Sequence, residues 1–248
     1  MMLSVVILTK NEEDNIKDCL ERVKFADETI VIDDNSDDKT TQIAKKLGAK
    51  VYKRNLADDF AKQRNFGLKK AEGRWVLFVD ADERVHPRLA REIIQLVNDP
   101  LGQYSGFYLK RTDYIWGKKL THGEVGSLSL LRLARRLGGK WRRPVHEVWE
   151  VIGRKRSLKS PIYHFPHPNL AEFIAGVNWH SSLHAQANLE EGKKPTFVKI
   201  IIWPTGHFLK NYILKRGFLD GIEGFVVALM MSFHSFLSWS KLWQGQKG

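Results

Sequence analysis

Short apolar runs alternate with helix-like patterns over the first hundred residues. Four runs have the length and continuity of buried parallel strands: 4–8, 28–33, 50–53 and 74–80. Helices are predicted between and after them: 11–23, 38–47, 58–71 and 87–97. Asn11 is the expected N-cap of the first helix, and Asp58 or Asp59 of the third. This order predicts an α/β fold with an open, mostly parallel, Rossmann-like sheet and helices on both faces.

The pattern changes after about residue 100. Longer, half-exposed strands are expected at 105–111 and around 114–116, and the run 128–136 fits either a strand or a helix. The stretches 145–153 and 160–165 are rich in aromatic residues and histidine. From Asn169 the pattern is helical to the end, so three segments are predicted: 1–100, 101–168 and a C-terminal helical tail over 169–248.

Two apolar runs stand out in this tail, at 199–203 and 225–239. Basic residues surround them: Lys199, Lys210, Lys215, Arg216 and Lys241. The longer run, with 15 residues, is shorter than the roughly 20 residues that span a bilayer. An interfacial helix pair on anionic lipid, a helix packed on the core and a dimer contact are the three alternatives.

Composition adds a strongly basic balance to this picture. The formal net charge is +12 and the sequence pI about 9.7, which favours nucleic acid, anionic lipid or phosphorylated substrates as partners. A hydrophobic content of 43% is typical of a folded chain. The lone Cys19 cannot form an internal disulfide, and the first residues do not resemble a signal peptide. A cytoplasmic location is therefore expected.

Acidic and amide side chains follow three of the predicted strands, where open α/β sheets bind their ligands. Asp80 and Asp82 come directly after the strand at 74–80 and can approach one Mg²⁺ or Mn²⁺, with phosphate oxygens completing its shell. The alternative is an ordinary acidic turn. Asp34, after the strand at 28–33, can accept a hydrogen bond from a base or a ribose, or simply belong to a turn.

Two further segments carry candidate ligand-binding residues. Thr9, Asn11 and Glu12 end the first strand and can receive a nucleoside, with a helix cap as the alternative interpretation. Arg64 lies in a predicted helix and can contact a phosphate through two N–H groups. A solvated helix charge is the alternative for this arginine.

Four segments carry a family resemblance: SVVILTKNEE (4–13), IDDNSDDKT (32–40), FAKQRNFGL (60–68) and WVLFVDADE (75–83). In this order they resemble family 2 glycosyltransferases, which have the GT-A fold. Within that family the chain looks like the lipopolysaccharide core β-1,4-glucosyltransferase group, which GGKWRRPVHE (138–147) and PIYHF (161–165) also resemble. One departure is Lys10-Asn11, because many members have an aromatic residue just after the first-strand threonine.

The resemblance implies a UDP-sugar donor, a divalent cation (Mg²⁺ or Mn²⁺) and a saccharide or glycolipid acceptor. Residues 1–100 would form the donor half of a GT-A domain and 101–168 its acceptor side, and 169–248 would follow as the C-terminal helical segment, for which membrane association, core packing and a dimer contact stay open. The donor-binding roles fall on Thr9, Asn11, Glu12, Asp34, Arg64 and Asp80. Asp82 would be the main protein ligand of the metal and Asp80 would contact ribose or metal. His164 would complete the metal shell, although a packed core histidine fits the same position.

An inverting single displacement is the expected reaction, with a base on the acceptor side outside the first hundred residues. His146 and Glu147 are the candidate pair, and Glu147 is preferred because family members usually use a carboxylate. A structural ion pair of Glu147 with Arg142 or Arg143 is the alternative.

Other enzyme classes lack their motifs here. No G-x-G-x-x-G follows a strand, no P-loop is present, and TKNEED has no glycine to cradle the triphosphate of a nucleotidyltransferase. A non-catalytic protein binding lipid or nucleic acid through its basic surface is the remaining alternative. Acids at three strand ends would repel phosphate in the absence of a cation, which argues against nucleic acid as a partner.

Overall fold

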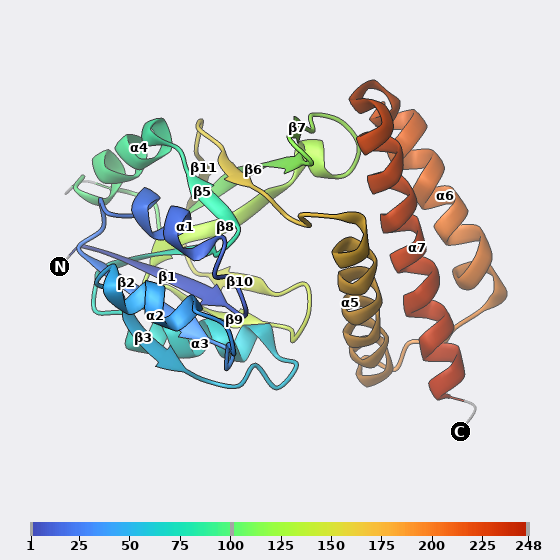
Figure 1. Ribbon diagram of the computed structural model, residues 1–248, viewed down its shortest axis with the longest axis horizontal. Helices are drawn as coiled ribbons and strands as arrows, with labels where there is room; N and C mark the ends of the chain where they lie inside the picture. The colour runs from blue at the N-terminus through green and yellow to red at the C-terminus, as the bar shows by residue number, and fades with distance from the viewer. Residues whose placement is uncertain (1, 100–101, 247–248) are drawn as a thin grey trace. The chain divides into compact units, whose positions relative to one another are not determined.

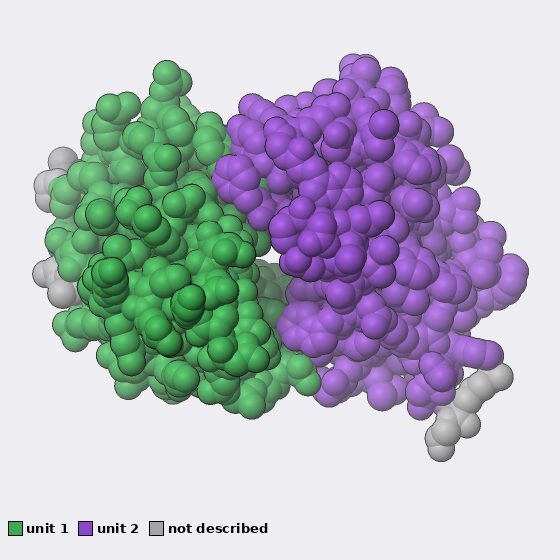
Figure 2. Space-filling model, in the orientation of Figure 1, with its two compact units in different colours: residues 1–111, 129–164 green, residues 112–128, 165–248 purple. Residues whose placement is uncertain are grey.

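The chain divides into two compact units, coloured separately in Figure 2. The computed structural model describes residues 2–99 and 102–246. Unit 1 comprises residues 1–111 and 129–164, and unit 2 comprises residues 112–128 and 165–248. The helical segment predicted from Asn169 onward thus belongs to a unit that also takes in a short excursion of the chain after residue 111.

The first part of unit 1 is a parallel sheet in the order β3-β2-β1-β4, as the alternation of apolar runs predicts (Figure 1). Its strands are β1 (Leu3–Thr9), β2 (Glu28–Asp33), β3 (Lys50–Lys53) and β4 (Trp75–Asp80). The connecting helices are α1 (Ile16–Arg22), α2 (Thr40–Lys46) and α3 (Phe60–Lys70). Asp59 caps α3 by accepting a hydrogen bond from the Lys62 N–H at 2.8 Å.

Antiparallel strands extend the sheet beyond β4. The run 128–136 is a strand, β8 (Ser129–Arg135), which pairs with β4 on one side and with β6 (Gly106–Ile115) on the other. The sheet continues through β12 (Ile162–His164) to β5 (Glu83–Val85), and β11 (Lys155–Ser157) pairs with β6. A separate hairpin joins β9 (Gly139–Arg142) to β10 (Val148–Val151), and helix α4 spans Pro87–Val97.

Side chains alternate along β4 between two apolar clusters, one on each face of the sheet. Leu77 and Val79 pack with residues of α1, α2 and α4. Phe78 packs with α3 and with Trp141 and Trp149 of the β9–β10 hairpin. Because both faces of β4 are buried, its sequence is continuously apolar rather than alternating. This layered sheet, with a helical C-terminal part, is the predicted fold class.

The start of α1 differs from the prediction. The helix begins at Ile16 and Asn15 precedes it, so Asn11 is not its N-cap. Asn11 instead has a φ of 52°, because its N–H donates to Ser36 Oγ at 2.9 Å while its Oδ1 accepts from the Asp37 N–H at 3.0 Å. These bonds to the neighbouring strand-end loop hold the segment open as a turn, and asparagine tolerates that backbone conformation.

Unit 2 is built from α5 (Leu170–Glu190), α7 (Gly221–Gly245) and the irregular helix between them. That helix consists of α6 (Trp203–Leu209) between two π-helical turns, η2 (Val198–Ile202) and η3 (Lys210–Leu214), followed by the short helix η4 (Gly217–Asp220). Helix α7 packs against both α5 and α6 (Figure 1). The excursion 112–128 adds β7 (Lys118–Lys119) and η1 (Val125–Ser127).

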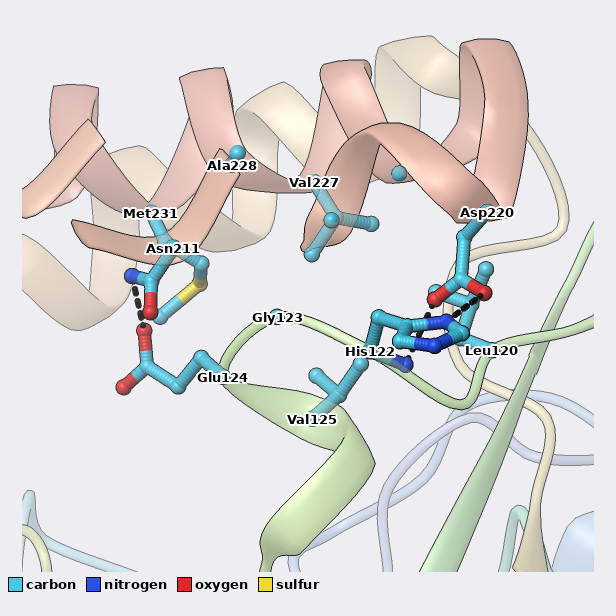
Figure 3. A pocket seen from close by; sticks show the side chains of 12 residues that line it. Leu120, His122, Gly123, Glu124, Val125, Asn211, Asp220, Val227, Ala228 and Met231 are labelled. Carbon is cyan, nitrogen blue, oxygen red and sulfur yellow. Dashed lines mark hydrogen bonds and ion pairs between the residues drawn. The ribbon is translucent and has the colours of Figure 1, made fainter. Parts of the chain in front are cut away.

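Polar contacts tie the excursion to the helices (Figure 3). The carboxylate of Asp220 accepts hydrogen bonds from the N–H groups of Thr121 at 3.0 Å and His122 at 2.8 Å. Glu124 Oε2 lies 3.2 Å from Asn211 Nδ2 and 3.1 Å from His207 Nε2. The start of α7 is therefore fixed to the rest of unit 2.

The apolar run 225–239 lies within a helix longer than the run itself. Helix α7 has 25 residues, so the 15-residue run underestimated its length. Among the described residues, one continuous helical stretch, Gly217–Gly245, is long and apolar enough to cross a membrane by length and composition alone. Core helices of soluble proteins also pass this test, so the finding does not establish a span.

Candidate active site

The carboxyl ends of three neighbouring strands meet in unit 1 and bring the predicted donor residues together. In the parallel register, Thr9 pairs with Asp33 of β2, and Leu8 pairs with Asp80 of β4. Asp34 follows Asp33 directly, and Asp82 follows Asp80 after Ala81. Residues more than seventy positions apart in the sequence therefore share one edge of the sheet, as expected for strand ends of a parallel sheet.

Asp34 and Thr9 form the first part of this edge. Asp34 Oδ1 accepts from the Leu56 N–H at 2.8 Å, and its Oδ2 lies 3.0 Å from Lys10 Nζ. Thr9 is buried, and within the part of the chain that the structure describes its Oγ1 has no hydrogen-bond partner. A buried hydroxyl without a partner is costly, so Thr9 Oγ1 is suited to a bond with a bound ligand.

Glu12 lies beside this edge and is half-buried. Its N–H donates to Thr40 Oγ1 at 2.7 Å, and its carboxylate accepts from Asn15 Nδ2 at 2.8 Å. Burial and then the negative charge of Asp82 raise the pKa of the Glu12 carboxyl to about 7. Near neutral pH this group can therefore donate as well as accept a hydrogen bond.

Two arginines hold Asp80 at the end of β4. Arg64 Nη2 lies 3.0 Å from Asp80 Oδ1, and Arg132 Nη2 lies 2.6 Å from Asp80 Oδ2. Both arginine side chains are almost fully buried, whereas the Asp80 side chain is 28% exposed. Burial acts to raise the pKa of Asp80, but the charges of Arg132 and Arg64 outweigh it and hold that pKa well below its ordinary value.

Arg64 is not a solvated helix charge but the centre of a buried network. Its guanidinium carbon lies 4.9 Å from the ring centre of Trp141 and 5.7 Å from that of Phe78. Its Nε donates to Glu147 Oε1 at 2.7 Å. Trp141 is itself fixed to α3, because Asn65 exchanges two hydrogen bonds with the Trp141 main chain, of 2.9 and 3.0 Å.

Glu147 thus has a partner that the sequence did not indicate. It pairs with Arg64 of α3, while Arg142 pairs with Glu150 across the β9–β10 hairpin at 3.2 Å. Through Arg64, Glu147 belongs to the same network as Asp80, so this residue from outside the first hundred positions lies close to the predicted donor residues. His146 is exposed, with a φ of 52°, in the turn of this hairpin.

Asp82 and His164 form the other half of the edge. The antiparallel pairing of β5 with β12 places Glu83 opposite His164, and His164 Nε2 lies 3.1 Å from Asp82 Oδ2. Burial acts to raise the pKa of Asp82, but the attraction of His164 outweighs it and lowers that pKa. His164 is also buried, as the packed-core alternative expects, and its contact with Asp82 places it beside the predicted metal ligand.

The pair of Asp82 and His164 suits a divalent cation that also binds substrate. Across residues 2–99 and 102–246, no three His, Cys, Asp or Glu side chains gather closely enough to hold a metal ion on their own. Mg²⁺ in nucleotide sites usually has only one or two protein carboxylates, with phosphate oxygens and waters as its other ligands. The residues present therefore fit a cation shared with a diphosphate.

Two site residues were missed by the sequence reasoning. Arg132 bridges Asp80 and Glu83, whose Oε1 lies 3.7 Å away. Glu83 is fully buried and accepts from the Asp80 N–H at 2.9 Å; burial raises the pKa of its carboxyl. The available signal was Arg132 inside the apolar run LSLLRLA (128–134), because a charge at a buried strand position normally has a partner.

The family assignment rests on a comparison with family models. Residues 4–156 match the model of glycosyl transferase family 2, which is more than half of the chain. The chain belongs to family 2 of the glycosyltransferases. The matched residues include both Asp80 and Asp82 and the whole Arg64–Glu147 network. Membership sets aside the nucleotidyltransferase and the non-catalytic binding protein as alternatives.

Individual proteins similar to this glycosyltransferase agree with the assignment. The lipopolysaccharide core biosynthesis glycosyltransferase LpsC of Rhizobium meliloti is 28% identical, covering 98% of this chain and 92% of its own. An uncharacterised glycosyltransferase of Rickettsia typhi is 27% identical, covering 97% of this chain and 86% of its own. Glucosyl-3-phosphoglycerate synthase of Mycobacterium tuberculosis superposes with a TM-score of 0.51 at 17% identity, over 79% of this chain and 81% of its own. The sheet described above is a GT-A fold.

Proposed function

We propose that this family 2 glycosyltransferase transfers a hexose, glucose from UDP-glucose, to a saccharide acceptor of the lipopolysaccharide core or a related cell-envelope glycan. The similarity to LpsC over almost the whole chain supports the acceptor class. The residue-level resemblance described above supports the donor. We further propose that the enzyme acts in the cytoplasm; its single cysteine is buried and has no need of an oxidising compartment.

The observation that carries the donor assignment is the meeting of Asp34, Asp80 and Asp82 at the ends of adjacent strands around the buried hydroxyl of Thr9. Asp34 and Thr9 would hold the nucleoside, with Asn11 and Glu12 beside them. Asp82, just after β4, would face the diphosphate. In the expected arrangement, the sugar lies between this edge and the Glu147 turn.

Asp82 and His164 would hold the divalent cation, whose positive charge would stabilise the diphosphate as it leaves. Asp80 is expected to have a different role from Asp82. Both of its carboxylate oxygens accept hydrogen bonds from arginine, so in this network its charge is already compensated. We therefore assign Asp80 to ribose contact and to orienting Arg64, and Asp82 to the metal.

Glu147 is the proposed base of an inverting displacement, in which an acceptor hydroxyl attacks the anomeric carbon and loses its proton. Arg64 orients Glu147 by binding Oε1, and the side chain is 17% exposed, so the carboxylate is fixed yet reachable. His146, the alternative base, is exposed, and Glu147 is preferred because Arg64 holds its carboxylate in place.

Calorimetric titration with UDP tests the donor site, with and without Mn²⁺. Asp82→Asn should abolish the metal-dependent part of UDP binding and leave the fold intact, because Asp82 is partly exposed and the amide keeps its shape. Asp37→Asn is the matched control, an exposed aspartate on the neighbouring loop, and should bind UDP as the native protein does. Unchanged Mn²⁺-dependent affinity in Asp82→Asn would overturn the metal assignment. A screen of sugar nucleotides by thermal stabilisation identifies the donor.

A further inference from the structure

The turn between the two long apolar helices of unit 2 exposes a dense apolar surface. We name residues 213–222 the hairpin tip; it connects η3 to the first turn of α7, the red helix that runs beside orange α6 in Figure 1. Leu214 is 78% exposed and Ile222 77%. Ile213, Phe218 and Leu219 are each about half exposed as well. Scattered exposed apolar residues are normal, but five within ten positions are not.

The tip is a fixed structure and not a frayed end. Asp220 is buried and accepts hydrogen bonds from the N–H groups of Thr121 and His122, and its contact with His122 is drawn in Figure 3. The Gly123 N–H donates to the Lys215 carbonyl at 3.0 Å. Gly217 packs so closely that an added Cβ would lie 2.8 Å from the Asn211 carbonyl oxygen. The apolar side chains are thus held outward by an anchored turn.

The charge around the tip is of one sign. The segment 193–219 contains six lysines and arginines and no aspartate or glutamate. Lys215 and Arg216 lie in the hairpin tip itself, and Lys210 lies three positions before it, at the start of η3. The two acidic residues that follow are already engaged, since Asp220 binds the excursion and Glu223 lies 3.4 Å from Lys118.

The apolar exposure continues down both helices from the tip. Leu209 and Ile202 are exposed on the α6 side, and Phe225 and Leu229 on α7. In the helical stretch 217–245, only 28% of the most apolar 18-residue window is buried. A helix that is apolar because it packs in the core of unit 2 would be mostly buried. The exposed apolar side chains of α7 therefore need another partner.

We propose that the hairpin tip is a membrane-docking surface that inserts its apolar side chains into the interface of an anionic lipid bilayer. Lys210, Lys215 and Arg216 would contact the lipid head groups. Cations attract an anionic leaflet, and apolar side chains beside them enter the boundary between head groups and acyl chains. A second copy of the chain is a poor partner, because the same acid-free basic segment would face itself. This proposal does not depend on the identity of the donor or acceptor.

Cosedimentation of the full chain with vesicles tests the surface. Vesicles of phosphatidylcholine with 30% phosphatidylglycerol, a composition chosen for roughly physiological negative surface charge, are compared with pure phosphatidylcholine. Native protein should bind the anionic vesicles, and less at high salt. Leu214→Ser with Ile222→Ser should weaken binding on the order of tenfold or more, since two insertable side chains are lost. Lys215→Gln with Arg216→Gln should weaken it roughly tenfold on anionic vesicles.

Matched controls come from unit 1. Leu137 and Ile152 are 86% and 84% exposed, so Leu137→Ser with Ile152→Ser removes the same kind of surface elsewhere and should bind as native protein does. Lys17→Gln with Lys24→Gln is the charge control, and both lysines are exposed. Equal binding by the tip variants and the native protein would overturn the proposal.

A second measurement locates the inserted side chain directly. Because Cys19 is fully buried, a cysteine introduced as Leu214→Cys can be labelled selectively with a polarity-sensitive dye. Its emission should shift to the blue on anionic vesicles, while the same label at Leu137→Cys should not respond. A shift that appears without vesicles as protein concentration rises would assign the tip to a dimer instead. Resistance to extraction at high pH would show a spanning helix and likewise overturn docking.

Discussion

Replacing Arg132 with methionine should destabilise unit 1 more than any comparable change at an exposed arginine. Arg132 Nη2 lies 2.6 Å from Asp80 Oδ2 and 3.7 Å from Glu83 Oε1, and its side chain is 7% exposed. Methionine fills much of the same volume but removes the positive charge. Glu83, which is fully buried, would lose its countercharge, and Asp80 would keep only Arg64.

The expected magnitude follows from the burial of this network. Removing one partner of a buried ion pair costs about 3–5 kcal/mol, because the other charge is left uncompensated. Since Asp80 retains Arg64 and is partly exposed, we expect the lower end, about 3 kcal/mol. For a chain of this size each kcal/mol corresponds to about 2–4 °C, so the melting temperature should fall by about 6–12 °C.

Thermal unfolding followed by circular dichroism and tryptophan fluorescence measures this difference. Arg142→Met is the matched control, because Arg142 pairs with Glu150 at 3.2 Å while both side chains remain more than half exposed. Arg142→Met should lower the free energy of unfolding by at most about 1 kcal/mol. Adding Glu83→Gln to Arg132→Met should recover part of the loss, because an amide at this fully buried position leaves no uncompensated charge. If Arg132→Met melts within 2 °C of the control, the buried network does not carry the stability assigned to it.

Three further predictions concern other parts of the chain. Glu147→Gln should lower turnover by roughly 100-fold or more while UDP affinity stays near normal, since the amide oxygen can still accept from Arg64; lost UDP binding would remove Glu147 from the role of base. Burial acts to raise the pKa of Asp220, but its bonds from His122 and Thr121 outweigh it and lower that pKa, so Asp220 stabilises unit 2 above its ordinary pKa. That contribution should be lost as the pH falls below about 4, and melting curves of Asp220→Asn should lack this acid-dependent part. Gly67→Ala should cost about 1–3 kcal/mol in denaturant unfolding, because its Cβ would lie 2.5 Å from a Val6 methyl carbon, whereas Gly206→Ala has open space and should be neutral or stabilising.

The strand ends show how much of the fold and of the candidate site a local sequence pattern can predict. Continuous apolar runs such as β4 predicted buried parallel strands, and the right order of strands placed Thr9, Asp34 and Asp82 on one edge. This worked because a parallel sheet aligns the carboxyl ends of its strands whatever the intervening sequence does. The start of α1 was misplaced, because the bonds of Asn11 to Ser36 and Asp37 come from another loop and leave no trace in local sequence.

The sequence by itself thus determined the α/β core, the family and the meeting of acidic strand ends at one edge, because these follow from hydrophobic periodicity and from motifs at strand ends. Only the tertiary structure decided which charged side chains pair with one another. It brought Arg132 to Asp80, Arg64 to Glu147 and His164 to Asp82 across separations of 52, 83 and 82 positions. It also decided which apolar residues of the tail face outward. Burial and ion pairing depend on which segments lie side by side, and that information resides in the packing of the whole chain.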